Sequence, residues 1–435
     1  MKWFVSVVAI LLISLAFDLG LLAYAMYVLL GLLVVSRLLT RSWIEGLSAT
    51  RECNRLSAEI GDTVAVCVTV QNRGRWPVPW VLLEDLVAWP PSYVGPPPLK
   101  LLGKRMKISL LRGGGRTIMN YQLRFEMRGY YQVGPVVLES GDLFGLHRRY
   151  EARTEPHFVL VYPHITPLEG YNVESRRPIG EIRISHRLYE DPTRIAGIRP
   201  YQPGDPLNRV HWRATARTHT LQSKTYEPSS VAGGTILLDF HQAAFDRRHE
   251  PYRSELAVSA AASLANALYQ LGQQVGLATN GRDAAQRIQE EGWQHDFRTR
   301  KAALQAASLS ATNDRLAPLV VDTRRGPEQL RRILETLARL ELTDGLTFPQ
   351  LILETAARLP RDASVLAVLP EASVETALAL GNLRRRGFAV TAILNLYEES
   401  DYALSAGRLL AEGVQSRHLK DEAGLGALCA RHVLG

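Results

Sequence analysis

The N-terminal forty-five residues constrain the chain most, because two apolar runs follow each other with almost no polar interruption. Residues 3–17 are apolar except for two serines, and residues 21–35 are apolar again. One helix over both runs would be roughly 50 Å long, well beyond the ~30 Å hydrocarbon core of a bilayer. Two helices with a tight turn at residues 18–20 fit better. We therefore predict a transmembrane helical hairpin over residues 1–45.

A cleaved signal peptide is the alternative for this segment, since residues 23–25 (Ala-Tyr-Ala) mimic a cleavage site. Residues 26–30 are still membrane-like, which favours the hairpin. Lys2 precedes the first run and arginines within residues 37–41 follow the second, whereas the turn carries only Asp18. The positive-inside rule then predicts an inner (cytoplasmic) membrane protein whose two ends and soluble domains face the cytoplasm.

The totals fit a protein of two or three domains with real hydrophobic cores. The 435 residues are 46% hydrophobic, and the formal net charge is +8. Lys and Arg are spread along the chain without a nucleic-acid-binding motif, so we expect no nucleic-acid partner. Cys53, Cys67 and Cys429 form no C-x-x-C pair. Neither a disulfide framework nor a zinc site is indicated, and no cofactor is expected.

From about residue 47 the hydrophobic pattern changes to a period of two. Val64, Val66, Val68 and Val70 alternate with small or polar side chains, and residues 119–127 alternate in the same way. This alternation is typical of half-buried antiparallel strands. It predicts an Ig-like β-sandwich domain over residues 46–165.

Residues 231–435 instead alternate short apolar runs with helical patterns. The strand-like runs are residues 235–240, 274–278, 364–369 and 388–396, and the helical patterns are residues 254–271, 327–340, 347–359 and 373–386. Alternating strands and helices predict an α/β domain with a doubly wound parallel sheet. Residues 388–396 are expected to form the last strand of that sheet, at its edge.

The densest cluster of functional-looking residues lies between these domains, in the segment 166–230. Its members are Arg199, Tyr201, Gly204, Asp205, Arg209, His211, Trp212 and Arg217. Asp205 follows a proline-glycine turn, where it can cap the next element or pair with an arginine. Arginine suits bidentate contacts with carboxylates or phosphates. The cluster is interpreted either as a structural ion-pair network or as a partner-binding site.

We expect the signature segment to link the two soluble domains at their junction. Asp205 and Arg209 are close enough in sequence to share one polar network, with Trp212 packed beneath it and Arg217 at the outer edge. The opposite hypothesis makes Trp212 an exposed contact. His211 is the only side chain of general-base type in the cluster, which does not make a catalytic constellation.

These residues carry a family resemblance. Arg-x-Tyr-x-x-Gly-Asp, Arg-x-x-Trp and Ala-x-Ala-Arg within residues 197–217 resemble the signature of the bacterial domain-of-unknown-function family 58. Supporting matches are Arg128-Gly129-x-Tyr131 with Gly134-Pro135, Asp-Leu-Phe-Gly-Leu at residues 142–146, and Val-Tyr-Pro at residues 161–163. Thr215 stands where the family usually has serine. The resemblance implies a membrane protein with a von Willebrand factor A-like C-terminal domain, associated with a MoxR-type AAA+ ATPase and with a membrane protein bearing a transglutaminase-like domain.

The von Willebrand factor A-like fold often carries a metal-ion-dependent site, written Asp-x-Ser-x-Ser, after its first strand. Here the corresponding residues are Asp239, His241 and Ala243, so the acid is kept and both serines are missing. Magnesium needs several hard oxygen ligands. The sequence therefore predicts a degenerate site without metal, in which Asp239 caps the end of a strand.

We expect a non-enzymatic, membrane-anchored cytoplasmic scaffold, because the sequence has no hydrolase triad, phosphate loop or H-E-x-x-H motif. The alternative is an enzyme that acts on a phosphorylated or cell-envelope substrate through Asp205, His211 and the arginines. An enzyme needs these side chains to converge in an accessible cleft. A scaffold predicts a buried network or an open surface.

Overall fold

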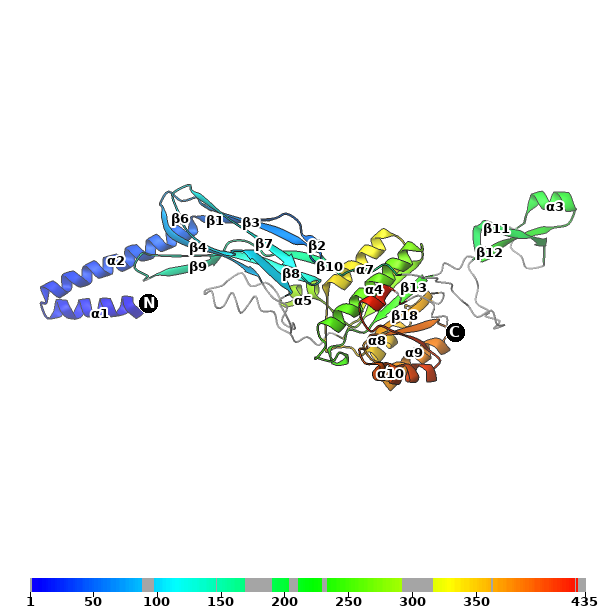
Figure 1. Ribbon diagram of the computed structural model, residues 1–435. Helices are drawn as coiled ribbons and strands as arrows, with labels where there is room; N and C mark the ends of the chain where they lie inside the picture. Colours follow the sequence, from blue (N-terminus) through cyan, green and yellow to red (C-terminus); the bar gives the residue numbers. More distant parts are fainter. Residues whose placement is uncertain are drawn as a thin grey trace.

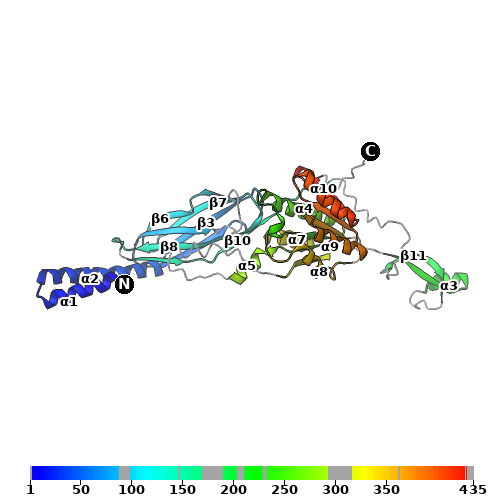
Figure 2. The same cartoon turned by 90° about the horizontal axis from the view of Figure 1, so that it is seen from below.

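The computed structural model describes residues 2–87, 98–145, 147–168, 190–202, 210–228, 233–291, 316–360, 363–426 and 428. These residues form an elongated molecule (Figure 1). Two N-terminal helices lie at one end, a β-sandwich and an α/β domain follow, and a small hairpin lies at the other end. A view turned by 90° shows the same order along the molecule (Figure 2).

The two N-terminal helices are confirmed. Helices α1 (Lys2–Ala16) and α2 (Gly20–Glu45) pack against each other as an antiparallel pair joined at residues 17–19. Helix α2 has 26 residues and is therefore about 39 Å long. Among the described residues it is the one helix long and apolar enough to cross a bilayer. Only 17% of its apolar 18-residue stretch is buried. Its last turns pack against the sandwich.

The β-rich region consists of two sheets packed face to face. Its strands are β1 (Leu47–Cys53), β2 (Ser57–Glu59), β3 (Thr63–Asn72), β4 (Val78–Val87), β5 (Leu99–Gly103), β6 (Met106–Leu111), β7 (Arg116–Phe125), β8 (Gly129–Gly141), β9 (Arg148–Ala152) and β10 (His157–Tyr162). One sheet has the order β1-β3-β7-β5, and the other has the order β2-β10-β8-β4-β6 with β9 paired to β8. The four valines of β3 and alternate residues of β7 point into the core, as their period of two predicts.

The C-terminal domain is a six-stranded sheet covered by helices on both faces. Its strands are β13 (Gly233–Leu238), β14 (Gln274–Thr279), β16 (Leu319–Arg324), β18 (Ala363–Leu369), β19 (Val390–Leu394) and β20 (Gln415–His418). Its helices are α4 (Tyr252–Gln270), α5 (Ala284–Glu291), α7 (Pro327–Arg339), α8 (Phe348–Thr355), α9 (Val374–Arg385), α10 (Glu399–Ala411) and α11 (Ala423–Gly426). The minor elements are η2 (Gln242–Ala244), β15 (Arg282–Asp283) and β17 (Leu340–Glu341).

The sheet differs from the predicted one in two ways. Its order is β16-β14-β13-β18-β19-β20, and β16 runs antiparallel to β14, so the sheet is mixed. Strand β20, and not residues 388–396, forms the edge beyond β19. Both differences concern edge strands. The four residues of β20 are all polar, so no apolar run marks them in the sequence, and strand direction leaves no periodic signal.

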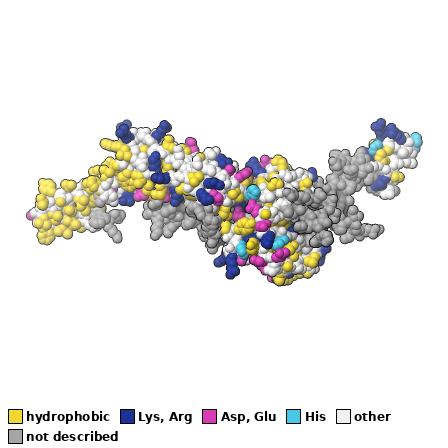
Figure 3. All heavy atoms as spheres, in the orientation of Figure 1, with side chains coloured by type: hydrophobic (Ala, Val, Ile, Leu, Met, Phe, Trp, Pro, Cys, Tyr) yellow, Lys and Arg dark blue, Asp and Glu magenta, His cyan; other side chains and the backbone are white. Residues whose placement is uncertain are grey.

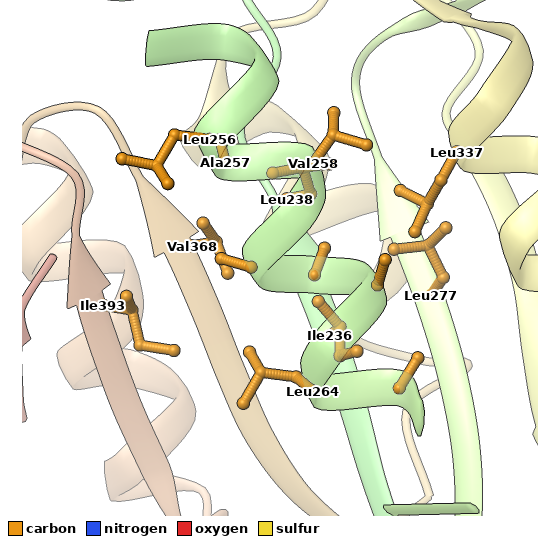
Figure 4. Packing of buried hydrophobic residues seen from close by; sticks show 14 of the residues in the cluster. Ile236, Leu238, Leu256, Ala257, Val258, Leu264, Leu277, Leu337, Val368 and Ile393 are labelled. Atoms are coloured by element: carbon orange, nitrogen blue, oxygen red, sulfur yellow. The ribbon is translucent and has the colours of Figure 1, made fainter. Parts of the chain in front are cut away.

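Helix α4 forms the centre of one face of this domain (Figure 4). Its Leu256 and Leu264 lie over Ile236 of β13 and Val368 of β18, and all four side chains are buried. Helix α7 packs beside α4 on this face, whereas α8, α9 and α10 cover the other. The alanine-rich face of α4 allows close approach to the sheet, which gives the dense packing typical of a core.

One arginine joins the sandwich to the α/β domain. Arg128, in the connection between β7 and β8, donates through Nη1 to the carbonyl oxygens of Leu337 and Leu340, at 2.8 Å each. Its Nη2 lies 3.1 Å from Oε1 of Glu255 on α4. The guanidinium also lies 5.5 Å from the centroid of the Phe240 ring. This single buried side chain thus caps the C-terminal end of α7 and forms an ion pair with Glu255 on α4.

The neighbouring residues fix the position of Arg128. The Tyr131 hydroxyl donates toward the carbonyl oxygens of Met127 at 2.9 Å and of Arg128 at 3.2 Å. A Cβ atom on Gly129 would lie 2.9 Å from the Tyr131 ring, closer than real Cβ atoms approach, so this close contact requires glycine. The motif Arg128-Gly129-x-Tyr131 therefore builds the interface between the two domains.

We predict that Arg128→Ala costs about 3 kcal/mol of stability, because it leaves Glu255 without its buried partner and the α7 carbonyls without a donor. The measurement is the thermal unfolding temperature of the detergent-solubilised full chain. The matched control is Arg124→Ala on β7, whose 3.3 Å ion pair with Glu126 lies at the surface and should contribute less than about 1 kcal/mol. Equal shifts for the two variants would contradict this account of the junction.

Candidate functional site

The signature segment forms a separate hairpin. Strands β11 (Glu190–Pro200) and β12 (Gln222–Pro228) pair antiparallel, and the short helix α3 (Trp212–Thr218) lies between them in sequence and packs on β12. Both ribbon views show this hairpin beyond the α/β domain, on the side away from the sandwich (Figures 1 and 2). We refer to residues 197–202 and 210–224, whose side chains are described, as the signature hairpin.

Two expectations about this segment are wrong. The described signature hairpin does not lie at the junction of the two domains, which Arg128 forms instead. Trp212 does not pack beneath a polar network, because its side chain is 68% exposed. The physical reason is size: a seven-residue helix on a two-stranded sheet has too little apolar interior to bury an indole.

The predicted site residues are only partly brought together. Arg199 lies near the end of β11, where its guanidinium donates to the carbonyl oxygen of Pro200 at 3.3 Å. The backbone N–H of Tyr201 donates to the carbonyl oxygen of Leu221 at 2.9 Å, which extends the pairing of the strands. His211, Trp212 and Arg217 lie on or next to α3. Gly204, Asp205 and Arg209 lie outside the described residues, and so does the predicted Asp205–Arg209 network.

Two side chains set the shape of α3. His211 is its N-cap, and the imidazole Nδ1 accepts a hydrogen bond from the backbone N–H of Ala214 at 3.0 Å. Thr215 Oγ1 accepts from the backbone N–H of Gln222 at 3.0 Å, which ties the helix to β12. A serine hydroxyl could make the same contact. The change from the residue usual in the family therefore keeps the chemistry.

The outer surface of the signature hairpin is basic and partly apolar. Its exposed apolar side chains are Ile198, Trp212 and Leu221. Its basic residues are Arg199, Arg213, Arg217 and Lys224, and none of its described residues is acidic. Figure 3 shows the Lys, Arg and His side chains gathered at this end of the molecule. Such a surface complements a partner that offers carboxylates next to an apolar groove.

A second predicted site lies at the carboxyl end of β13. Oδ1 of Asp239 accepts from Nδ2 of Asn280 at 2.9 Å and from the backbone N–H of His241 at 3.2 Å. Oδ1 of Asn280 accepts from the backbone N–H of Phe240 at 2.6 Å. Burial raises the pKa of the Asp239 carboxyl, and the hydrogen bond from Asn280 partly opposes that shift. The side chain of Asp239 thus holds the strand end to its neighbour.

His241 and Ala243, the other two residues of the predicted degenerate site, form part of a short turn. Nδ1 of His241 accepts from the backbone N–H of Ala243 at 3.2 Å and so caps the 3₁₀ turn η2. Within the described part of the chain, no group of three or more His, Cys, Asp or Glu side chains could hold a metal ion. Sequence reasoning missed Asn280, although a polar residue two positions after the strand-like run 274–278 is a signal for this edge of the sheet.

The hydroxyl of Thr215 offers a test of the hairpin. Thr215→Val keeps the side-chain shape but removes the acceptor for the Gln222 amide, at a cost of about 1 kcal/mol, so that this amide should exchange with solvent roughly fivefold faster. Hydrogen exchange of the full chain measures the rate. Thr215→Ser is the control and should keep the protection. Unchanged exchange in the valine variant would show that this bond does not hold α3 on β12.

Known proteins resemble the chain in two regions. The family described as "Protein of unknown function DUF58" matches residues 197–340, which begin with the signature hairpin and end after α7. The Uncharacterized protein YeaD of Bacillus subtilis (strain 168) is 25% identical over 275 residues, which cover 62% of this chain and 65% of that protein. The match thus spans just under two thirds of the relative's length.

Similar solved structures cover about a quarter of the chain. The CARDB domain of the PF1109 protein from Pyrococcus furiosus is 12% identical over 26% of this chain and 86% of its own, with a TM-score of 0.19. The ASH / PapD-like domain of human CEP192 is 16% identical over 26% of this chain and 82% of its own, with a TM-score of 0.18. Scores this low carry no argument about function.

The family match therefore begins at the signature hairpin, where the motif residues Arg199, Tyr201, His211, Trp212 and Arg217 lie. Residues 197–340 thus match the DUF58 family of proteins of unknown function, and the chain is similar to one uncharacterised relative.

Proposed function

We propose that this chain is a non-enzymatic, membrane-anchored scaffold that captures a protein partner with its signature hairpin. Helices α1 and α2 would anchor it in the inner membrane, and the soluble domains would face the cytoplasm. The observation that carries the proposal is Trp212, which is 68% exposed beside the exposed Arg213 and Arg217 at the end of the molecule away from the helices.

The chemistry of this surface supports protein capture. Tryptophan and arginine dominate the few residues that contribute most of the energy of protein–protein interfaces. An indole left in solvent gains by burial in a partner's apolar pocket, and the guanidinium groups of Arg213 and Arg217 would pair with carboxylates at the rim. The described residues of the signature hairpin include no acidic side chain that could compete for either arginine.

The enzyme alternative has less support. Nδ1 of His211 is engaged as the cap of α3 at 3.0 Å from the Ala214 nitrogen, so the imidazole serves a structural purpose. The side chains of Trp212 and Arg217 are both exposed to solvent on the described signature hairpin. A catalytic site requires convergent side chains that exclude water.

The more specific assignments of the two folds and of the partners rest on the family resemblance. We infer that the sandwich is Ig-like and that the α/β domain is von Willebrand factor A-like, with Asp239 at the end of its central strand β13 as the remnant of a metal site. The proposed partners are a MoxR-type AAA+ ATPase and a membrane protein that bears a transglutaminase-like domain. Nucleic acid is not proposed, because no recognisable nucleic-acid-binding motif accompanies the basic residues, which are spread along the chain.

Partner capture is tested with the full chain, purified from solubilised membranes together with its bound proteins. Trp212→Ala should weaken capture by about 2 kcal/mol, or roughly thirtyfold, and should change stability by less than about 0.5 kcal/mol because the side chain is exposed. Trp76→Ala is the matched control, since Trp76 is 66% exposed on the sandwich. Capture that survives Trp212→Ala, or that nuclease treatment abolishes, would contradict the proposal.

Membrane topology has its own test. The charge asymmetry predicts that a reporter fused after Gly435 lies in the cytoplasm, whereas a label introduced near Asp18 is accessible from the opposite side of the membrane. Protease protection and label accessibility in intact and opened cells measure both positions. A C-terminal reporter outside the cytoplasm would overturn the proposed localisation.

A further inference from the structure

The turn between β8 and β9 presents two large apolar side chains to solvent. Leu143 is 74% exposed and Phe144 is 68% exposed, in the Asp-Leu-Phe-Gly-Leu run that supports the family resemblance. Single exposed apolar residues are common on protein surfaces. Two adjacent ones at the tip of a turn need a further reason, and the surroundings of this turn supply one.

Asp142 makes this turn rigid. Its backbone N–H donates to the carbonyl oxygen of His147 at 3.1 Å, and Oδ1 of Asp142 accepts from the backbone N–H of His147 at 3.0 Å. Gly145 lies between them with a φ of +73°, in the left-handed region that favours glycine. Two hydrogen bonds between Asp142 and His147 therefore hold the two ends of the turn together. Leu143 and Phe144 lie exposed between these two hydrogen-bonded residues.

The same aspartate fastens the turn to α2. Oγ of Ser36 donates to Oδ2 of Asp142 at 2.8 Å and lies 3.1 Å from Nδ1 of His147. Ser36, Thr40 and Ile44 form one buried stripe of α2 that packs against β8 and β9. The position of the turn along α2 is thus set by Ser36, and Figure 1 shows β9 beside this helix.

Ser36 lies where the apolar span of α2 ends. Residues 21–35, which precede Ser36, are apolar, and the residue that follows Ser36 is Arg37. Helix α1 has 15 residues and runs antiparallel to α2, so its first residue, Lys2, lies level with about Val35 of α2. Two charged residues from different helices therefore mark one level of the molecule. The Leu143–Phe144 pair is attached at this level.

We propose that Leu143 and Phe144 insert into the cytoplasmic leaflet of the bilayer beside α2, as a second membrane contact of the sandwich. Apolar side chains at this level gain by leaving water for the boundary between head groups and acyl chains. Arg148 and Arg149 follow the turn directly, with side chains 64% and 45% exposed at the start of β9. Each also lies at long range from a glutamate, Glu139 at 3.7 Å and Glu45 at 4.0 Å, and the exposed guanidinium groups favour anionic head groups. The expected lipid surface is therefore an acidic phospholipid bilayer.

This contact would fix the tilt of the sandwich. Helices α1 and α2 alone permit rotation about the helix axis, whereas a second contact beside them on the same membrane removes that freedom. Since the α/β domain is docked to the sandwich through Arg128, the direction of the signature hairpin would be set as well. The inference rests on the proposed membrane anchoring, and its test separates the two.

The experiment places a photoreactive residue at single positions of the full chain, reconstituted in vesicles of phosphatidylethanolamine and phosphatidylglycerol. The test variant is Phe144→p-benzoylphenylalanine. Val28→p-benzoylphenylalanine reports on the span itself, because Val28 is 70% exposed on α2. Leu410→p-benzoylphenylalanine is the matched control, since Leu410 is 73% exposed on α10 in the α/β domain. The readout is the yield of protein–lipid adducts by intact mass.

The proposal predicts adducts at position 144 at a yield close to that at position 28, with only background at position 410. Adducts at position 28 with background at position 144 would overturn the insertion of the turn and leave the anchoring intact. Background at position 28 would overturn the anchoring itself, and the second contact with it. Yields at positions 144 and 410 that are equal and well above background would show contact without insertion and would also overturn the proposal.

Discussion

The ion pair and hydrogen bonds of Arg128 hold the β-sandwich and the α/β domain together. A buried guanidinium must find partners, and here the partners all belong to the other domain: the carbonyl oxygens at the end of α7 and the carboxylate of Glu255 on α4. Removing any of them leaves a buried charge or acceptor unpaired. The arrangement is therefore cooperative, and it makes the sandwich a rigid spacer, not a tethered module.

This rigidity would give the elongated shape a role in the proposed scaffold. Helix α2 continues without interruption from its apolar span into the sandwich, where Ser36 is bound to Asp142. Arg128 continues the connection into the α/β domain, and the signature hairpin lies beyond it. A scaffold built in this way would hold its basic, tryptophan-bearing surface at a set distance from the membrane. The proposed insertion of Leu143 and Phe144 would add a set direction.

The sequence predicts local patterns well and distant contacts poorly. The valines of β3 and the turn between α1 and α2 follow from periodicity and from the length of a bilayer span. Neither the direction of β16 nor the polar edge strand β20 leaves such a pattern. The carbonyl oxygen of Leu337, one partner of Arg128, is 209 residues away in sequence, and no spacing rule connects the two residues. At the candidate site, the motif located the hairpin, but the exposure of Trp212 depends on how little core surrounds it.

The most direct test of this account is the distance between the two domains in the full chain. Nitroxide amino acids at the positions of Ile118 and Leu353, which are 43% and 72% exposed on the sandwich and the α/β domain, report it by electron–electron double resonance. The account predicts one narrow distance distribution that broadens when Arg128 is replaced by alanine. A broad distribution in the unaltered chain, or a narrow one that is unchanged without Arg128, would contradict the claim that this arginine makes the molecule rigid.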